Sequence, residues 1–151
     1  MFFDVISEVE MKALGEKLGL FLNGGEVVEL IGDVGSGKTT FVKGLAVGLS
    51  ISDYVQSPSF TISRVYDGRD NLKLAHYDFY RLEDSGLMGD ELHEAILDKN
   101  KIVIIEWAGL VAGVLPEDRL SIKINILSEN SRHLEFIAGG DTSRKLLEKI
   151  K

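Results

Sequence analysis

Cysteine is absent from this chain of 151 residues. Its absence excludes disulfide bridges, thiolate catalysis and cysteine-ligated metal sites. It is also consistent with a reducing compartment such as the cytosol, where structural disulfides are rare. Any catalysis or metal binding must therefore come from other side chains.

Positive charge is also scarce. Lys and Arg together number 17 against 24 Asp and Glu, which gives a net charge of −7 and a pI near 5.0. This balance argues against a broad basic surface that holds nucleic acid by phosphate neutralisation alone. We therefore expect any contact with RNA to be local or shared with a partner.

Long apolar runs are missing as well. No segment approaches the length that spans a bilayer, and Met1–Asp4 lacks the basic region and the long apolar stretch of a signal peptide. We therefore expect a soluble, cytoplasmic protein without membrane association.

The overall composition is that of an ordinary folded domain. Hydrophobic residues make up 44% of the chain and charged residues 27%, so disorder is not expected. A length of 151 residues predicts one domain, residues 1–151, with a proper hydrophobic core. The chain is too short for a nucleotide-binding domain plus a separate catalytic domain, so partners are expected to complete the function.

The most informative stretch is a glycine-rich loop between an apolar run and a helical pattern. Its residues are Gly32, Asp33, Val34, Gly35, Ser36, Gly37, Lys38, Thr39 and Thr40. They fit the phosphate-loop pattern G-x-x-x-x-G-K-[ST], with the expected strand before the loop and helix after it. The pattern predicts a site for nucleotide phosphates. The alternative is an ordinary glycine turn before a helix.

Each residue type in this loop has a physical reason. Glycine lets successive backbone N–H groups converge on phosphate oxygens, and the helix that follows adds free N–H groups and a positive dipole end. Lys38 supplies a charge that reaches the β- and γ-phosphates, and the Thr39 hydroxyl is a ligand for Mg²⁺. The loop therefore predicts that a nucleoside triphosphate is bound, but it does not indicate which process uses that nucleotide.

Periodicity assigns most of the remaining chain to helices and strands. A Ser-x-x-Glu capping box at Ser7 begins a helix with Met11 on its apolar face. Residues 108–114 are ambiguous between loop and short helix. The other expected elements are strand 26–31, helix 38–49, a hairpin of 62–66 and 72–77, helix 87–97, strand 101–107, a hairpin of 120–127 and 133–138, and a last helix capped by Asp141 or Thr142.

This order of elements predicts an α/β fold. We expect a single P-loop NTPase-like domain with a mixed, mostly parallel central sheet that is flanked by helices. The two hairpins make part of the sheet antiparallel, because their connections are too short for a parallel crossover.

Glu106 ends the β-branched run 102–105, which has the character of a buried central strand. Phosphate-loop enzymes place the acid that holds Mg²⁺, directly or through water, at the carboxyl end of such a strand. We therefore favour a Walker B-like metal role for Glu106. The alternative is an acid that merely emerges at the strand end.

The pattern His-x-Asp-x-Tyr-Arg ends the second strand of the first hairpin. Alternation places His76, Asp78 and Tyr80 on one face, which could meet the phosphates. Asp78 could orient the attacking water or the Mg²⁺ shell, and His76 could form a hydrogen bond with Asp78. Arg81 could meet phosphate or pair with a nearby acid. A solvated strand end explains the same spacing.

Two more features near these motifs are candidates. Ser57, Ser59 and Thr61 lie in a polar, proline-marked segment that could sense the γ-phosphate, as mobile hydroxyl-bearing loops do in nucleotide switches. A plain turn is the alternative. Trp107 follows Glu106 and is more typical of a core or an interface than of base stacking.

Four motifs taken together resemble one family. They are Gly35–Thr40 (GSGKTT), Ser57–Thr61 (SPSFT), His76–Arg81 (HYDFYR) and Ile105–Trp107 (IEW). Their order and spacing cover nearly the whole chain and closely resemble the TsaE (YjeE) family. These proteins are bacterial ATPases needed for making threonylcarbamoyladenosine in tRNA. The combination is far more specific than the phosphate loop alone.

The resemblance implies a compact P-loop domain that binds ATP and Mg²⁺ and hydrolyses ATP weakly on its own. In the family it joins the threonylcarbamoyl transferase subunit TsaD and its companion TsaB, and ATP hydrolysis supports repeated turnover of the transferase. The modified base is the adenosine beside the anticodon, so contact with tRNA is expected only through the complex.

The family pattern also implies roles for individual residues. Lys38 and the rest of the loop from Asp33 to Thr40 bind the nucleotide, Thr39 and Glu106 serve Mg²⁺, and Asp78 is needed for hydrolysis. The Ser57–Thr61 segment is switch-like.

Two positions depart from the family pattern. A threonine usually lies near the adenine in a Ser-x-x-x-Thr setting, but Ser7 is followed at that spacing by Met11. A thioether donates no hydrogen bond, so Met11 could instead pack on the base, and the affinity or base selectivity for ATP is the property affected. Ser59 stands where the family often has threonine and keeps the hydroxyl.

Three other functions are compatible with a phosphate loop in a short chain. A GTPase is disfavoured because no [Asn/Thr]-Lys-x-Asp guanine motif occurs: Asn100 and Lys101 are followed by Ile102 and Val103. A small-molecule kinase would need an acceptor pocket and an arginine-bearing lid, and residues 87–97 offer little of either. The third is a nucleotide-gated binding module with negligible catalysis. Measured ATP turnover separates these functions.

Overall fold

The computed structural model describes residues 1–58, 60–84 and 86–151, and within them the chain forms seven strands and four α-helices. The strands are β1 (Phe2–Val5), β2 (Val27–Ile31), β3 (Ser63–Asp67), β4 (Lys73–Asp78), β5 (Lys101–Glu106), β6 (Leu120–Ile126) and β7 (Arg132–Ala138). The helices are α1 (Glu8–Phe21), α2 (Lys38–Gly48), α3 (Gly86–Leu97) and α4 (Asp141–Ile150), with 3₁₀ segments η1 (Arg69–Asn71) and η2 (Ala108–Val114). Residues 108–114, ambiguous from sequence, are therefore helical.

The strands form one mixed sheet in the order β1-β7-β6-β2-β5-β4-β3. The four central strands, β6, β2, β5 and β4, pair in parallel. The outer strands are antiparallel: β3 to β4, β7 to β6, and β1 to β7. The predicted α/β class, with a mostly parallel centre and two antiparallel hairpins, is confirmed. Strand β1 adds an edge, because the apolar segment after Met1 pairs with β7.

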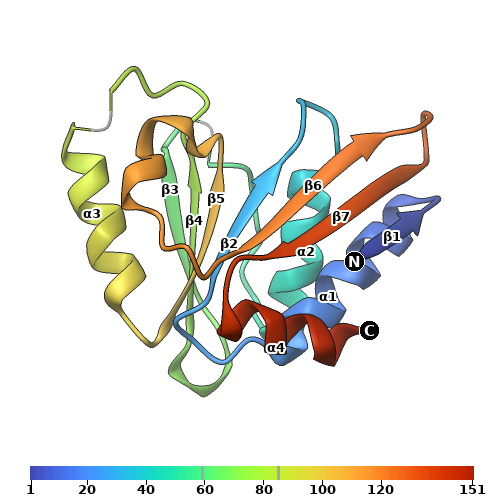
Figure 1. The fold of residues 1–151 in the computed structure, drawn as a ribbon, viewed down its shortest axis with the longest axis horizontal. Coiled ribbons are helices and arrows are strands. Elements are labelled where there is room, and N and C mark those ends of the chain that lie inside the picture. The colour runs from blue at the N-terminus through green and yellow to red at the C-terminus, as the bar shows by residue number, and fades with distance from the viewer. Residues whose placement is uncertain (59, 85) are drawn as a thin grey trace.

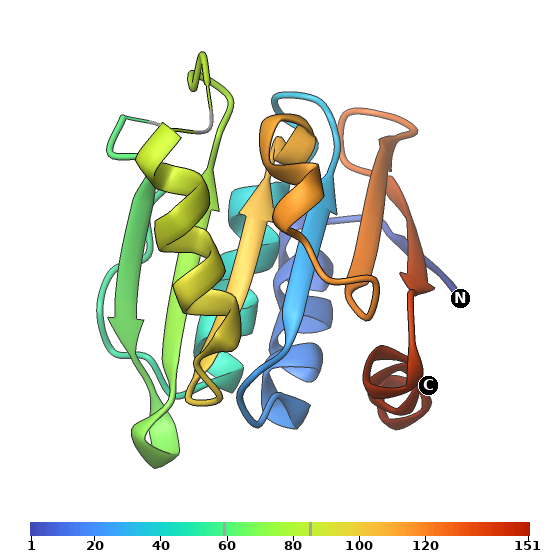
Figure 2. The ribbon, with the colours of Figure 1, turned by 60° about the vertical axis from the view of Figure 1, so that its left-hand side comes forward.

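Helices cover both faces of this sheet (Figures 1 and 2). Helices α1 and α2 lie against one face, whereas α3 and η2 lie against the other, and α4 packs beside α1 and β7. Alternation along β5 serves both layers. Ile102 and Ile104 pack into the core under α1 and α2, and Val103 and Ile105 pack into the core under α3.

Helices α1 and α2 approach each other unusually closely. A Cβ atom added to Gly15 would lie 2.2 Å from the carbonyl oxygen of Phe41, and one added to Gly44 would lie 2.0 Å from that of Lys12. Only glycine leaves room for such backbone-to-backbone contact. The contact fixes α2, the helix that begins at the phosphate loop, against α1.

The last helix begins differently from the prediction. We expected Asp141 or Thr142 to cap it, but the N-cap is Gly140, which has no side chain to accept a hydrogen bond. Asp118, from the segment before β6, accepts from the backbone N–H groups of Thr142 and Ser143 at 2.9 and 3.0 Å. A remote carboxylate thus takes the capping role.

No helix within the described residues is long and apolar enough to span a bilayer. The longest, α1, has 14 residues, Glu8–Phe21. It is capped as the sequence predicts, because the Ser7 hydroxyl accepts from the N–H of Glu10 at 3.1 Å.

Candidate functional site

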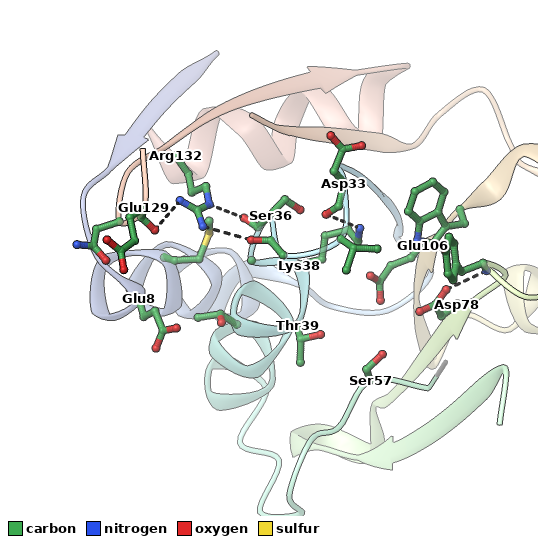
Figure 3. Close-up of a pocket in the computed structure, with 18 of the residues that line it drawn as sticks. Glu8, Asp33, Ser36, Lys38, Thr39, Ser57, Asp78, Glu106, Glu129 and Arg132 are labelled. Carbon is green, nitrogen blue, oxygen red and sulfur yellow. Dashed lines mark hydrogen bonds between the residues drawn. The ribbon is translucent and has the colours of Figure 1, made fainter. Parts of the chain in front are cut away.

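A cavity of about 430 Å³ opens at the carboxyl edge of the parallel strands, beside the start of α2 (Figure 3). The whole predicted loop from Asp33 to Thr40 lines it. Its remaining lining residues are Ser7, Glu8, Met11, Ser57, Asp78, Tyr80, Glu106, Trp107, Glu129, Asn130 and Arg132. Carboxyl edges of parallel sheets are where α/β proteins bind their ligands, because the loops that leave the strands converge there.

The loop has the geometry of an anion-binding site. Gly35 and Gly37 have φ angles of 82° and 102°, a left-handed region that glycine adopts without strain. Gly37 is also the N-cap of α2, so the first free N–H groups of that helix face the cavity. A left-handed cap on a helix N-terminus is the arrangement in which backbone N–H groups gather around phosphate oxygens.

Lys38 is buried within the loop. Its ammonium group donates to the carbonyl oxygens of Gly32 and, at 3.2 Å, of Asp33. It also lies 4.9 Å from the centre of the Trp107 ring, within the range of a cation–π contact. The positive charge of Lys38 is therefore held in place between the start of the phosphate loop and the Trp107 ring.

Asp78 and Glu106 lie side by side at the cavity. They are paired in register at the carboxyl ends of β4 and β5, and Glu106 is also opposite Leu30 at the end of β2. Both side chains are buried, and Asp78 accepts a hydrogen bond from the N–H of Tyr80 at 3.0 Å. The sheet thus places these two carboxylates in the same cavity as the Lys38 ammonium group and the Thr39 hydroxyl.

His76 pairs with a carboxylate that the sequence did not indicate. A hydrogen bond to Asp78 or a solvated strand end was open from the sequence, but Nε2 of His76 lies 2.6 Å from Oε2 of Glu106, and the imidazole is fully buried. Nδ1 finds no hydrogen-bond partner among the described residues. An unpaired lone pair is less costly than an unpaired N–H, so the ring proton belongs on Nε2, where it is donated to Glu106.

The aromatic residues gather at one side of the cavity. Trp107 has a left-handed backbone, with φ at 56°, and its ring lies 4.8 Å from that of Tyr80. Tyr80 lies beyond the end of β4, yet its side chain still lines the cavity. Both residues are partly exposed, at 53% for Tyr80 and 38% for Trp107, so Trp107 lies at the rim of the cavity rather than in the core.

Not every predicted residue reaches the site. Ser57 lines the cavity, but the Thr61 hydroxyl donates to the carbonyl of Pro58 at 3.5 Å and is not among the lining residues. Arg81 lies over the ring of Phe60 at 4.9 Å and does not line the cavity. Ser59 lies outside the described residues.

The cavity includes residues that the motifs did not indicate. Ser7 and Glu8 come from the start of α1, Glu129 and Asn130 come from the turn between β6 and β7, and Arg132 is the first residue of β7. Their positions depend on long-range packing, and no local pattern marked them. For Ser7, the sequence indicated a role as helix cap and a place in the Ser-x-x-x-Thr setting of the family pattern.

Met11 is part of the cavity wall and also of the core. It is 3% exposed, and its Cε lies 3.1 Å from the point where a Cβ on Gly37 would sit. The thioether therefore packs directly on the backbone of the phosphate loop. The expected contact with a nucleotide base stays a prediction.

Three polar side chains that line the cavity suit a hard cation. The Thr39 hydroxyl and the carboxylates of Asp78 and Glu106 offer oxygen atoms, which Mg²⁺ prefers. Within the described part of the chain, no group of three or more His, Cys, Asp or Glu side chains forms a metal cage. Few protein oxygens beside a phosphate-binding loop match the way Mg²⁺ binds together with nucleotide phosphates.

Comparison with known proteins agrees with this geometry. The family model described as "Threonylcarbamoyl adenosine biosynthesis protein TsaE" matches residues 5–134. The chain belongs to the TsaE family. The resemblance inferred from the four motifs is therefore confirmed.

Relatives within the TsaE family match over most of their length. The tRNA threonylcarbamoyladenosine biosynthesis protein TsaE of Bacillus subtilis is 38% identical over 150 residues, covering 96% of this chain and 90% of that protein. The protein of the same name from Treponema pallidum is 39% identical over 120 residues, covering 80% and 87%. The crystal structure of Bacillus subtilis YdiB superposes with a TM-score of 0.82 at 36% identity, covering 99% and 93% of the two chains.

Proposed function

We propose that this protein is the ATP-binding, weakly ATP-hydrolysing subunit that supports turnover of the enzyme making threonylcarbamoyladenosine in tRNA, in the cytoplasm. One observation carries the proposal: in a TsaE-family fold, Lys38 and Thr39 of the phosphate loop face Asp78 and Glu106 across one cavity. A loop that binds phosphates and two carboxylates that can serve a metal ion and a water molecule are the parts that ATP hydrolysis needs.

The residues fit a nucleoside triphosphate. A volume of about 430 Å³ suits a ligand of nucleotide size, and the loop amides with Lys38 supply donors for the phosphate chain. The phosphates belong at the loop, so their terminal end meets Asp78 and Glu106. Adenine is favoured over guanine because the chain has no [Asn/Thr]-Lys-x-Asp motif.

The site also fits Mg²⁺. Thr39 would bind the ion through its hydroxyl, and Glu106 through its carboxylate, directly or through water. When bound, Mg²⁺ would supply positive charge that offsets the negative charge developing on the phosphate during transfer. Glu106 is held by His76, so its carboxylate is presented in one orientation.

Asp78 is the candidate for positioning the attacking water. It lies next to Glu106 in the sheet, and the N–H of Tyr80 orients one of its oxygens. A carboxylate in this position can accept a hydrogen bond from water and align it with the terminal phosphate. Lys38 stabilises charge on the phosphate oxygens during the reaction.

Partners are expected to complete the site. The side chains of Val34, Tyr80 and Trp107 at the cavity are 72%, 53% and 38% exposed, so an apolar rim surrounds polar catalytic groups. Such a rim suits a protein partner. We propose TsaD-like and TsaB-like subunits as these partners. With a net charge of −7, contact with tRNA is proposed to occur through that complex.

The test is ATP turnover by the purified protein, measured alone and with the TsaD-like and TsaB-like subunits and tRNA. We expect slow turnover alone and stimulation by the partners. Lys38→Ala serves as the inactive control, and Lys145→Ala, an exposed lysine on α4, serves as the matched control. Absence of stimulation by the partners would contradict the proposal and favour a kinase. ATP binding without turnover would favour a nucleotide-gated binding module.

A further inference from the structure

Arg132 connects two parts of the cavity wall that are far apart in the sequence. Its Nε donates to the carbonyl oxygen of Ser36 at 3.0 Å, and its Nη2 donates to that of Gly35 at 3.2 Å. Its Nη1 donates to the carbonyl oxygens of Ser128, Glu129 and Ser131, at 2.8, 3.2 and 2.9 Å. One guanidinium thus joins the phosphate loop to the turn between β6 and β7 (Figure 3).

These contacts determine which way the peptide groups of the loop face. The chain has no cis peptide bond among its described residues, and in a trans peptide the C=O and the following N–H point in opposite directions. Because Arg132 binds the C=O of Ser36, the N–H of Gly37 points away from the guanidinium. It is by N–H groups of this kind that a phosphate loop binds its anion.

The turn held by Arg132 forms one end of the cavity. Figure 3 shows Glu129 and Arg132 at one end, and Asp78 and Glu106 at the other, with the phosphate loop between them. If the terminal phosphate lies near the two carboxylates, the nucleoside lies toward the turn. A ligand that spans the cavity therefore meets both parts that Arg132 joins.

We propose that Arg132 is a positioning residue for nucleotide binding. It holds the peptide groups of Gly35–Gly37 in the orientation that binds phosphate, and it couples this orientation to the turn at residues 128–131. The inference rests on the proposed function and deepens it, because it assigns a residue that no motif of the site includes. Preorganised donors bind an anion more tightly, since the loop does not have to be ordered on binding.

The planar shape of arginine matters for this role. The guanidinium reaches carbonyl oxygens in two directions with a rigid set of N–H groups, and a lysine ammonium group cannot reproduce that span. A lysine would, however, keep the positive charge near the phosphates. Substitution by lysine therefore separates positioning of the loop from simple attraction of the anion.

The first test is the affinity for ADP with Mg²⁺, measured by calorimetry. We expect Arg132→Gln and Arg132→Lys to weaken binding by about tenfold or more. Arg144→Gln is the matched control, because Arg144 is exposed on α4 and its side chain pairs with Asp141 of the same helix. Wild-type affinity in Arg132→Lys would overturn the proposal, because charge alone would then account for the role of Arg132.

The second test needs no nucleotide. Hydrogen exchange should be faster in Arg132→Gln at the amides of both the loop (35–38) and the turn (128–131), with the rest of the protein unchanged. A merely structural role in the hairpin would accelerate exchange in the turn alone and leave ADP affinity at the wild-type value. That result would overturn the proposal.

Failure of this inference differs from failure of the proposed function. If the wild type binds ADP, Lys38→Ala does not, and Arg132→Gln binds normally, the role of Arg132 is wrong and the function stands. If the wild type and Lys38→Ala both fail to bind nucleotide, the proposed function is wrong.

Discussion

Nε2 of His76 lies 2.6 Å from Oε2 of Glu106, and both side chains are buried. The two residues are neighbours only in the sheet, since β4 and β5 are separated by α3 in the chain. A buried carboxylate needs such a donor, because an unpaired charge in the interior is expensive. The imidazole thus stabilises Glu106 and fixes its direction at the cavity.

Substitution of His76 should affect hydrolysis more than binding. His76→Phe removes the donor and leaves the Glu106 carboxylate unpaired, so we expect partner-stimulated turnover to fall about tenfold or more. His76→Gln keeps an N–H near the position of Nε2 and should retain most of the activity. Turnover and ADP affinity are measured on both variants, after circular dichroism has shown that they fold. Equal activity in the two variants would contradict the positioning role.

Lys38→Ala should abolish nucleotide binding. The substitution removes the Lys38 ammonium group, which is held at the phosphate loop. In the proposed complex, this charged group contacts the terminal phosphates. The measurement is titration of ATP and ADP into the variant. Lys145→Ala, which lies on exposed α4, should bind as the wild type does. Retained affinity in Lys38→Ala would show that the phosphates bind elsewhere.

Asp78→Ala and Glu106→Ala should lower hydrolysis much more than binding. Their proposed roles are at the water and the metal ion, where interactions strengthen in the transition state. We expect turnover to fall by roughly a hundredfold, with ADP affinity changed by only a few-fold. Asp90→Ala, an exposed acid on α3, is the control. Unchanged hydrolysis in Asp78→Ala would exclude it from the reaction.

Local patterns predicted most of the elements and the loop chemistry. The phosphate loop, the capping box at Ser7 and the β-branched strand before Glu106 each depend on residues close together in sequence. The sequence placed Asp78 and Glu106 each at the end of a strand, but that these two strands are parallel neighbours is seen only in the structure. The predicted features are determined by short-range geometry and the periodicity of side chains.

Long-range contacts were not predictable in the same way. Three contacts join segments that only the folded sheet brings together. They are the pairing of His76 with Glu106, the hydrogen bonds from Arg132 to the phosphate loop, and the capping of α4 by Asp118. Met11 was noted as a departure from the family pattern, but its packing on Gly37 depends on how closely α1 approaches α2. A single sequence contains the residues that make such contacts, but it does not indicate which of them will be paired in the folded protein.

The close approach of the two helices predicts a destabilising substitution. Helix propensity alone would make Gly44→Ala stabilising, but its Cβ would lie 2.0 Å from the carbonyl oxygen of Lys12. The helices would have to separate, so we expect the free energy of unfolding to fall by about 3 kcal/mol. Gly109→Ala is the control, since no neighbouring side chain or backbone atom in the described part of the chain lies within 4 Å of its Cβ position. Urea denaturation measures both, and a stabilised Gly44→Ala would contradict the packing described.

Asp118 predicts how stability depends on acid. Burial raises the pKa of its carboxyl, but hydrogen bonds from Ser143 and Thr142 to the carboxylate outweigh that effect and lower the pKa from 3.8 to about 2. The folded state therefore favours the charged form. The stabilisation is fully present above pH 4 and is lost as the pH falls from about 4 toward 2.

Comparison with Asp118→Asn tests this dependence. At pH 7 the variant should be less stable by about 1 kcal/mol, because asparagine offers a single acceptor oxygen and no charge to the start of α4. The difference should shrink as the pH falls below 4, because the carboxyl of the unfolded chain takes up a proton there, whereas the folded carboxyl, with a pKa of about 2, stays charged and folding must release that proton. Urea denaturation of both proteins at pH 7, 4 and 3 gives the two curves. A difference that stays constant over this range would mean that the charge of Asp118 contributes nothing to the cap.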